Sequence, residues 1–126
     1  MTENEISKFI YECAIEVHRN LGGPGLLEGV YEEALVWELI QKGLKVERQA
    51  DLPVIYKNNR LDKTLKIDLI VENKVIVECK ATTKYNDIFE AQTLTYLRLA
   101  NMKLGMVINF GEKLVKNGIH RVVNGL

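Results

Sequence analysis

The sequence lacks several features that define particular classes of protein. It holds only two cysteines and two prolines in 126 residues, so no disulfide framework is expected, and Cys13 and Cys79 are predicted to be buried, reduced thiols of a cytoplasmic protein. No apolar run approaches the roughly 20 residues that a membrane helix needs. No signal peptide is expected at the N-terminus, which lacks a basic segment followed by an apolar one. We therefore expect no membrane partner.

An excess of charge of either sign is also absent. Seventeen basic residues balance seventeen acidic ones, so a nucleic-acid partner would need a locally basic surface. No Ser-His-Asp or Cys-His arrangement is present, and no phosphate-binding G-x-x-x-x-G-K-[ST] loop. The apolar content of 47% is ordinary for a globular protein. The length favours one domain over residues 1–126.

The stretch that remains informative is residues 65–82, LKIDLIVENKVIVECKAT. It contains two apolar runs of strand length, separated by a polar break at 72–74. A three-residue hairpin loop there would place Asp68 opposite Glu78. The strand period of two puts Lys80 on the same face as Glu78. Since charged side chains are rarely buried without a partner, this arrangement indicates a divalent-metal site with a cationic helper.

The three residues follow the pattern D-x9-E-x-K. Carboxylate oxygens of Asp68 and Glu78, with the backbone carbonyl of Cys79, suit Mg²⁺ or Mn²⁺. Lys80 would position an attacking water or neutralise charge that develops on a phosphoryl group. On spacing alone, an ordinary cross-strand ion pair at the end of a sheet is an equally good interpretation.

Apolar spacing predicts the elements around this hairpin. The helix expected over 27–42 would bury Val30, Ala34, Trp37 and Ile40. Four basic residues between 57 and 66 could contact phosphate, although a solvated turn is the favoured interpretation. The other predicted helices are 3–21 and 86–102, and the other predicted strands are 44–50, 54–56, 104–110 and 119–123.

Two further features could complete a site. Gln92 and Tyr96 are spaced i, i+4 on a predicted helix and would share one face, where they could bind phosphate or brace Lys80. The alternative is that Tyr96 packs against the core and Gln92 is solvated. Upstream, Glu28 and Glu32 lie one turn apart at the start of a helix, where acidic residues are usually favoured by the helix dipole. Either could supply a third carboxylate, and spacing does not decide between them.

Gly25, Glu28 and Tyr31 spell G-x-x-E-x-x-Y, within the run GLLEGVYEEAL at 25–35. Together with IDLIVENKVIVECKA at 67–81 and AQTLTYLRLANMKLGMVINFG at 91–111, the chain resembles the GxxExxY family, a branch of the PD-(D/E)XK nuclease superfamily. The resemblance implies an α/β, restriction-endonuclease-like fold. Its αβββαβ core would form a mixed central sheet flanked by helices, with an extra N-terminal helix.

The resemblance also implies roles for the candidate residues. Asp68, Glu78 and Lys80 would form the D…ExK triad. Gln92 and Tyr96 would form the Q-x-x-x-Y of RecB-like nucleases. A helical glutamate would complete the acids, at Glu32 if the spacing of resolvase-like members holds, with Glu28 still open.

Two of the departures from the family pattern lie next to the candidate site residues. Phe89 stands where a histidine is common, and Cys79 replaces an aliphatic residue. We expect the Cys79 side chain to face away from the site, so that only its carbonyl would ligate a metal.

The expected function is that of a Mg²⁺- or Mn²⁺-dependent nuclease that hydrolyses phosphodiester bonds of nucleic acid, with DNA favoured over RNA. The alternative is a non-catalytic nucleic-acid-binding or protein-interaction module on the same fold. A chain this small could also work as a homodimer or with a partner protein that supplies specificity.

Overall fold

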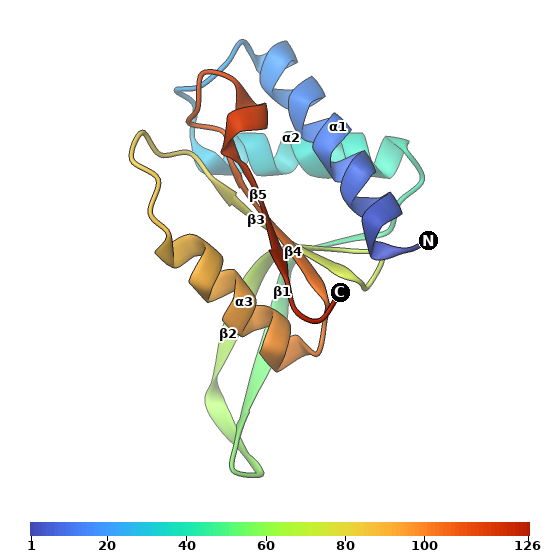
Figure 1. The fold of residues 1–126 in the computed structure, drawn as a ribbon, viewed down its shortest axis with the longest axis vertical. Coiled ribbons are helices and arrows are strands. Elements are labelled where there is room, and N and C mark those ends of the chain that lie inside the picture. The colour runs from blue at the N-terminus through green and yellow to red at the C-terminus, as the bar shows by residue number, and fades with distance from the viewer.

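The computed structural model describes residues 1–126 as an α/β fold with a five-stranded sheet (Figure 1). The order of elements agrees with the prediction, because α2-β1-β2-β3-α3-β4 is the αβββαβ core and α1 is the extra N-terminal helix. The elements are α1 (Glu3–Leu21), α2 (Glu28–Gln41), β1 (Val46–Tyr56), β2 (Asn59–Val71), β3 (Val75–Lys80), α3 (Ile88–Ala100), β4 (Leu104–Asn109), the 3-10 helix η1 (Val115–Gly118) and β5 (Ile119–Val123).

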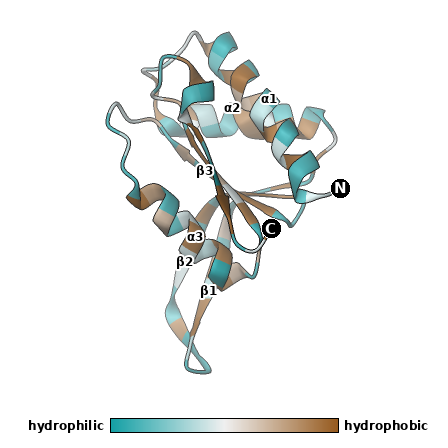
Figure 2. Cartoon of the chain, viewed as in Figure 1, coloured by the Kyte–Doolittle hydropathy of each residue, from teal (hydrophilic) through white to brown (hydrophobic).

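The sheet is mixed and follows the chain order β1-β2-β3-β4-β5. Only β3 and β4 are parallel, because α3 carries the chain back between them, and the other neighbours are antiparallel. Helices α1 and α2 cover one face and α3 covers the other (Figure 1). Figure 2 shows the apolar character of the central strands. Every residue of β4 is buried, as expected for a strand covered on both faces.

Helix α1 forms as predicted. Thr2 caps its first turn, and Thr2 and Glu5 make the reciprocal pair of a capping box. The apolar stripe through Ile6, Ile10 and Val17 is buried against the sheet. Gly22 ends the helix with a φ of +91°, a left-handed conformation that glycine adopts without steric cost.

The predicted inner face of α2 is wrong, because the buried residues lie on roughly the opposite side of the helix, about 170° from the predicted stripe at 100° per residue. Trp37 is 60% exposed, whereas Tyr31 is fully buried. Tyr31 stacks on Phe110 with ring centroids 4.8 Å apart, and its hydroxyl donates to the carbonyl of Gly23. The face that contains a tyrosine and a glutamate is therefore the buried one, which hydropathy alone does not reveal. The buried residues are Tyr31, Glu32, Leu35 and Leu39, and the predicted residues that are instead exposed are Val30, Trp37 and Ile40.

Strands β1 and β2 are longer than predicted and form a hairpin that extends from the body of the molecule (Figure 1). The two short strands expected at 44–50 and 54–56 are one strand, and β2 begins at Asn59. An irregularity in register between Pro53 and Ile55 accommodates the proline, which has no N–H to donate to the ladder. None of the three α-helices has the length and apolar content that crossing a membrane requires.

Candidate active site

Strands β2 and β3 stop pairing at the residues that the sequence singles out. The three-residue loop at 72–74 sets the predicted register, and the ladder runs from Val71–Val75 to Leu69–Val77. One residue further on, the Asp68 carboxylate accepts the backbone N–H of Cys79 at 2.8 Å, through Oδ2. The side chain of Asp68 therefore fills the fork between the diverging strands. Asp68 lies beside the Glu78–Lys80 segment, as predicted.

Glu78 is the most unusual group at this fork. Its residue is only 4% exposed, and its Oε1 atom is buried without a hydrogen-bond partner. Burial raises the pKa of its carboxyl to about 9, with a further contribution from the nearby Asp68 charge that Lys80 partly offsets. Buried polar atoms are nearly always paired, so an unpartnered carboxyl oxygen beside a second carboxylate fits a cation site.

Lys80 does not form a salt bridge with either acid. Its ammonium lies over the ring of Phe89, 4.7 Å from the centroid, which is a cation–π contact. Phe89 comes from the first turn of α3. The cross-strand ion pair that spacing alone allowed is therefore not formed, and the ammonium is held at the edge of the acid pair.

Phe89 is supported by a second layer of side chains. The ring of Tyr85 meets that of Phe89 edge-on, with centroids 5.4 Å apart. The Tyr85 hydroxyl donates to Glu90 at 3.1 Å, and its ring stacks on His120 at 4.1 Å. The loop after β3, the start of α3 and β5 thus fix the ring on which Lys80 lies. This support was not apparent in the sequence, because its members come from three separate segments.

Both helical acids lie near Asp68, but their surroundings differ. Glu32 is buried and its carboxylate accepts from Arg48 Nε at 2.7 Å. This contact raises the pKa of Arg48. Glu28 lies at the surface, its side chain makes no hydrogen bond, and it is within electrostatic reach of Lys80 and Asp68. Partial burial raises the pKa of Glu28, and Lys80 opposes that rise. Glu32 is therefore engaged by a cation of the chain, whereas Glu28 is free.

Gln49 is a site residue that the sequence analysis missed. Its side-chain amide donates to both carboxylate oxygens of Glu32 at 3.1 Å and approaches Asp68 Oδ1 at 3.5 Å. It lies opposite Asp68 on β1, between two regular ladder pairs, with a φ of +53°. That left-handed conformation is uncommon for glutamine. A glutamine in a strand of alternating polarity carries no local signal of this position.

The Q-x-x-x-Y pair is only half assembled at the site. Tyr96 is half-buried on α3, and its pKa is raised by burial and then by the charges of Glu78 and Asp68. The phenol therefore lies near the acid pair in its protonated form. The Gln92 side chain is exposed and forms no hydrogen bond. One turn of helix places the two residues at different depths relative to the fork.

The Cys79 side chain lies close to two of the candidate acids. It belongs to the core under α1 and α2 and is fully buried. That face also carries Glu32, and Cys79 Sγ lies within 4.8 Å of carboxylate oxygens of both Glu32 and Asp68. Burial, followed by these charges, raises the pKa of the thiol well above its ordinary value. Helix α2 places Glu32 on the same side of the sheet as the Cys79 side chain, which accounts for this proximity.

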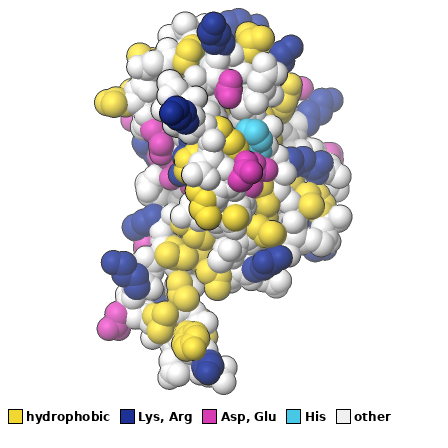
Figure 3. All heavy atoms as spheres, turned by 60° about the vertical axis from the view of Figure 1, so that its left-hand side comes forward, with side chains coloured by type: hydrophobic (Ala, Val, Ile, Leu, Met, Phe, Trp, Pro, Cys, Tyr) yellow, Lys and Arg dark blue, Asp and Glu magenta, His cyan; other side chains and the backbone are white.

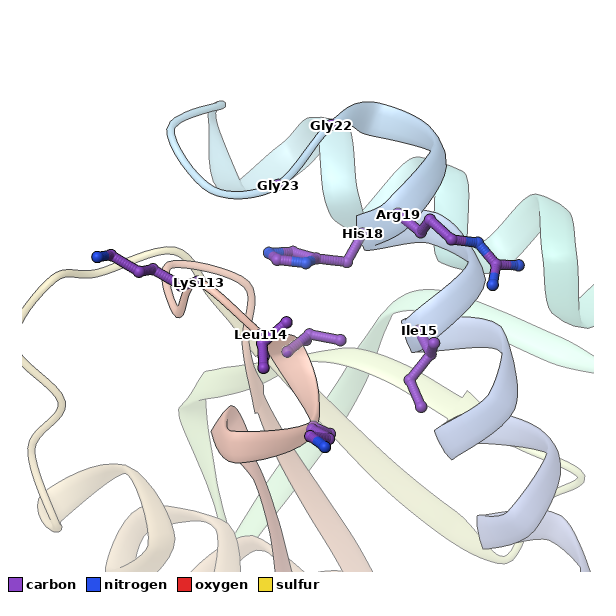
Figure 4. Close-up of a pocket in the computed structure, with 9 residues that line it drawn as sticks. Ile15, His18, Arg19, Gly22, Gly23, Lys113 and Leu114 are labelled. Carbon is purple, nitrogen blue, oxygen red and sulfur yellow. The ribbon is translucent and has the colours of Figure 1, made fainter.

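A cavity of about 430 Å³ lies elsewhere, between the end of α1 and the segment that leads into η1 (Figure 4). His18 projects into it and Arg19 points away (Figure 4). The His18 ring is buried and contacts the carbonyl of Phe110 at 3.1 Å through Nε2. None of the candidate site residues lines this cavity, and these contacts explain His18 as a packing residue.

Comparison with known proteins gives one match. The model of a family described as PD-(D/E)XK nuclease superfamily matches residues 4–122, which run from α1 to β5. No curated protein and no solved structure matches the chain. Nucleases of this superfamily act on nucleic acid and generally use a divalent metal ion. With the fold observed above and a match over nearly its whole length, the chain belongs to the PD-(D/E)XK nuclease superfamily.

Proposed function

We propose that the protein is a Mg²⁺- or Mn²⁺-dependent nuclease that hydrolyses phosphodiester bonds of DNA, with its catalytic centre at the fork between β2 and β3. The observation that carries this proposal is the buried, unpartnered Glu78 Oε1 beside Asp68, with the Lys80 ammonium held nearby on Phe89. An ion pair with a purely structural role would not leave a buried carboxylate oxygen without a hydrogen-bond partner. The GxxExxY resemblance supports the same assignment.

The donor set suits a hard divalent cation. Asp68 and Glu78 offer carboxylate oxygens, and the carbonyl of Cys79 lies between Glu78 and Lys80 in the chain. When bound, the cation would stabilise negative charge on the phosphoryl oxygens. Asp68 is already oriented for this task by the Cys79 N–H, which occupies one of its two oxygens. Its other oxygen, Oδ1, has only a long contact of 3.5 Å with the side-chain amide of Gln49.

Lys80 and Tyr96 would act on the substrate. The Lys80 ammonium is free of salt bridges, so it can approach the phosphate and offset the charge that develops as water adds to phosphorus. The Tyr96 phenol stays protonated and can donate a hydrogen bond to a phosphate oxygen. Gln92 would contribute from the exposed side of α3, where a nucleic-acid strand could contact it directly.

Among the helical acids, the contacts favour Glu28 as the one that completes the catalytic set. Glu32 already neutralises Arg48 and accepts both Gln49 contacts, so its use as a ligand would require breaking that network. Glu32 then positions Gln49 and the β1 strand next to Asp68. Glu28 has no partner to lose.

The test is cleavage of a panel of single-stranded, double-stranded and branched DNA and RNA substrates with Mn²⁺. Wild type is compared with Asp68→Ala and Lys80→Ala, and with Glu12→Ala and Lys42→Ala as matched surface controls on α1 and after α2. We expect cleavage of DNA that both site variants lose and both controls keep. Cleavage that persists in the site variants, or its absence for every substrate, would overturn the proposal and favour a non-catalytic module.

A further inference from the structure

The β1–β2 hairpin provides a surface that the active site does not explain. Its outer part, residues 53–64, is here called the arm. Every residue from 55 to 64 is exposed, and the arm projects away from the sheet and the helices (Figure 1). A two-stranded ribbon without a covering layer gains little from burial. We therefore look for the role of the arm in a partner that it contacts.

The arm carries a local excess of positive charge. It holds three basic residues and one acidic residue, in a chain that has equal numbers of basic and acidic residues overall. None of these cations forms a salt bridge. Figure 3 shows basic side chains along the edge and at the tip of the arm, with apolar ones between them. The basic residues are Lys57, Arg60 and Lys63, and the acidic one is Asp62.

The arm is ordered up to its tip. Tyr56 pairs with Asn59, and the two residues between them, Lys57 and Asn58, have φ values of +48° and +66°. Positive φ at both positions is the mark of a tight type I′ hairpin turn, whose twist matches that of the strands. Lys57 also lies over the ring of Tyr56, 5.6 Å from the centroid. The backbone positions that carry the charged side chains are therefore fixed by the pairing of the ribbon.

The arm is continuous with the strand that carries Asp68. Strand β2 leaves β3 at the fork and continues outward, so the arm and the body form two limbs that meet at the candidate catalytic centre. Asn59 lies nine positions before Asp68 on β2, which at about 3.3 Å per residue is roughly 30 Å. That reach is close to one helical turn of duplex DNA, about 34 Å. A two-stranded ribbon also fits the major groove of B-DNA, about 12 Å wide.

We propose that the arm is a docking limb for duplex DNA, which holds the phosphate backbone up to about one helical turn from the bond at the Asp68–Glu78 fork. This inference rests on the proposed function and extends it. A second copy of the chain is the competing occupant, because Ile55, Tyr56 and Leu61 are exposed on the arm. Pairing two arms would bring their like charges together, whereas a polyanion neutralises them. Charge therefore favours DNA.

The experiment measures the binding of a duplex of about two helical turns as a function of salt, in EDTA so that a metal-dependent nuclease cannot cut. Arg60→Gln/Lys63→Gln is compared with wild type and with Lys8→Gln/Lys42→Gln, a matched loss of two charges on the helical side. Each lost phosphate contact lowers the slope of log K against log salt by about 0.9. We expect the arm variant to lose nearly two units of slope and roughly tenfold in affinity at 0.1 M salt, and the control to lose neither.

Cleavage and association are measured on the same proteins. Hydrolysis of a small phosphodiester, bis-p-nitrophenyl phosphate, should be equal in the arm variant and wild type, because the arm is outside the catalytic centre. If the protein cleaves that ester or DNA but the salt slope of the arm variant equals that of wild type, the arm proposal is contradicted and the nuclease proposal is not. If the salt slope of the arm variant falls but no substrate is cleaved, the arm proposal is supported and the nuclease proposal is contradicted. The arm proposal is also contradicted if wild type is a dimer that Ile55→Ser/Leu61→Ser dissociates and the salt slope of the arm variant is unchanged. The absence of any duplex binding contradicts it as well.

Discussion

The carboxylate of Asp68 replaces a strand as the hydrogen-bond acceptor of the Cys79 backbone N–H, at 2.8 Å. The contact lies one step beyond the last ladder pair between β2 and β3. Asp68 thus has two tasks, because it satisfies a buried backbone donor and it presents a carboxylate at the fork. The two tasks can be separated by substitution.

Asp68→Asn should abolish cleavage and keep most of the stability, since an amide oxygen can still accept the Cys79 N–H. Asp68→Ala should abolish cleavage and also lower the free energy of unfolding by about 1–3 kcal/mol, because the N–H is left unpaired. Urea denaturation and cleavage assays on both variants check this. Equal stability of the two variants would show that the hydrogen bond is not important to the fold.

Glu78 should make the stability of the metal-free protein depend on pH. Its pKa is about 9 in the folded protein and near 4.5 when unfolded, so the folded state retains a proton that the unfolded state loses. The stabilisation is complete below pH 4.5 and is lost as the pH rises toward 9. Glu78→Gln should remove this loss, as measured by urea denaturation from pH 5 to 9. A parallel decline in the Gln variant would contradict the assignment.

Metal binding should release a proton from the same carboxyl near neutral pH, because a ligating carboxylate must be ionised. Calorimetric titration with Mn²⁺ in two buffers of different ionisation enthalpy measures the number of protons released. We expect the affinity to rise with pH until about 9 in wild type. Glu78→Gln should bind weakly and release no proton. Binding without proton release in wild type would place the metal elsewhere.

The aromatic ring of Phe89 should contribute to catalysis by holding Lys80 in place. Phe89→Leu removes the face on which Lys80 lies, and we expect a loss of about 2- to 10-fold in kcat with KM little changed, since a cation–π contact contributes roughly 0.5–1 kcal/mol or more. Phe89→Tyr keeps the ring and serves as the matched control, with near wild-type activity. Steady-state kinetics on a cleavable duplex decide it. Equal losses in both variants would point to packing instead.

Substitution of Glu28 and substitution of Glu32 should have different effects on metal binding and on stability. Glu28→Gln should weaken Mn²⁺ binding and cleavage without changing stability, because Glu28 is exposed and unpaired. Glu32→Gln leaves Arg48 without its buried partner, and should cost about 1–3 kcal/mol of unfolding free energy. Arg48→Gln, which breaks the same pair from the other side, is the matched control. Metal titration and urea denaturation distinguish the outcomes, and strong metal loss in Glu32→Gln alone would assign the ligand to Glu32.

Much of the fold could be predicted because its signals are local. The Thr2–Glu5 capping box, the apolar runs of β3 and β4 and the three-residue loop at 72–74 each depend on neighbours in the chain. The buried face of α2 could not be predicted this way, since Tyr31 is buried by stacking on Phe110, far away in the sequence. The length of the arm was hidden by Pro53, which local reasoning takes as the end of a strand.

For the candidate site, the sequence by itself determined the D-x9-E-x-K residues and their register, because a tight hairpin leaves only one alignment of its strands. Only the tertiary structure decided how the surrounding charges are paired. Gln49 and Arg48 are brought to Glu32 by the pairing of β1 with β2 and the packing of α2, and Lys80 meets Phe89 through the crossover of α3. These partners are separated along the chain, and pairing between charged groups depends on distance in space rather than on position in the sequence.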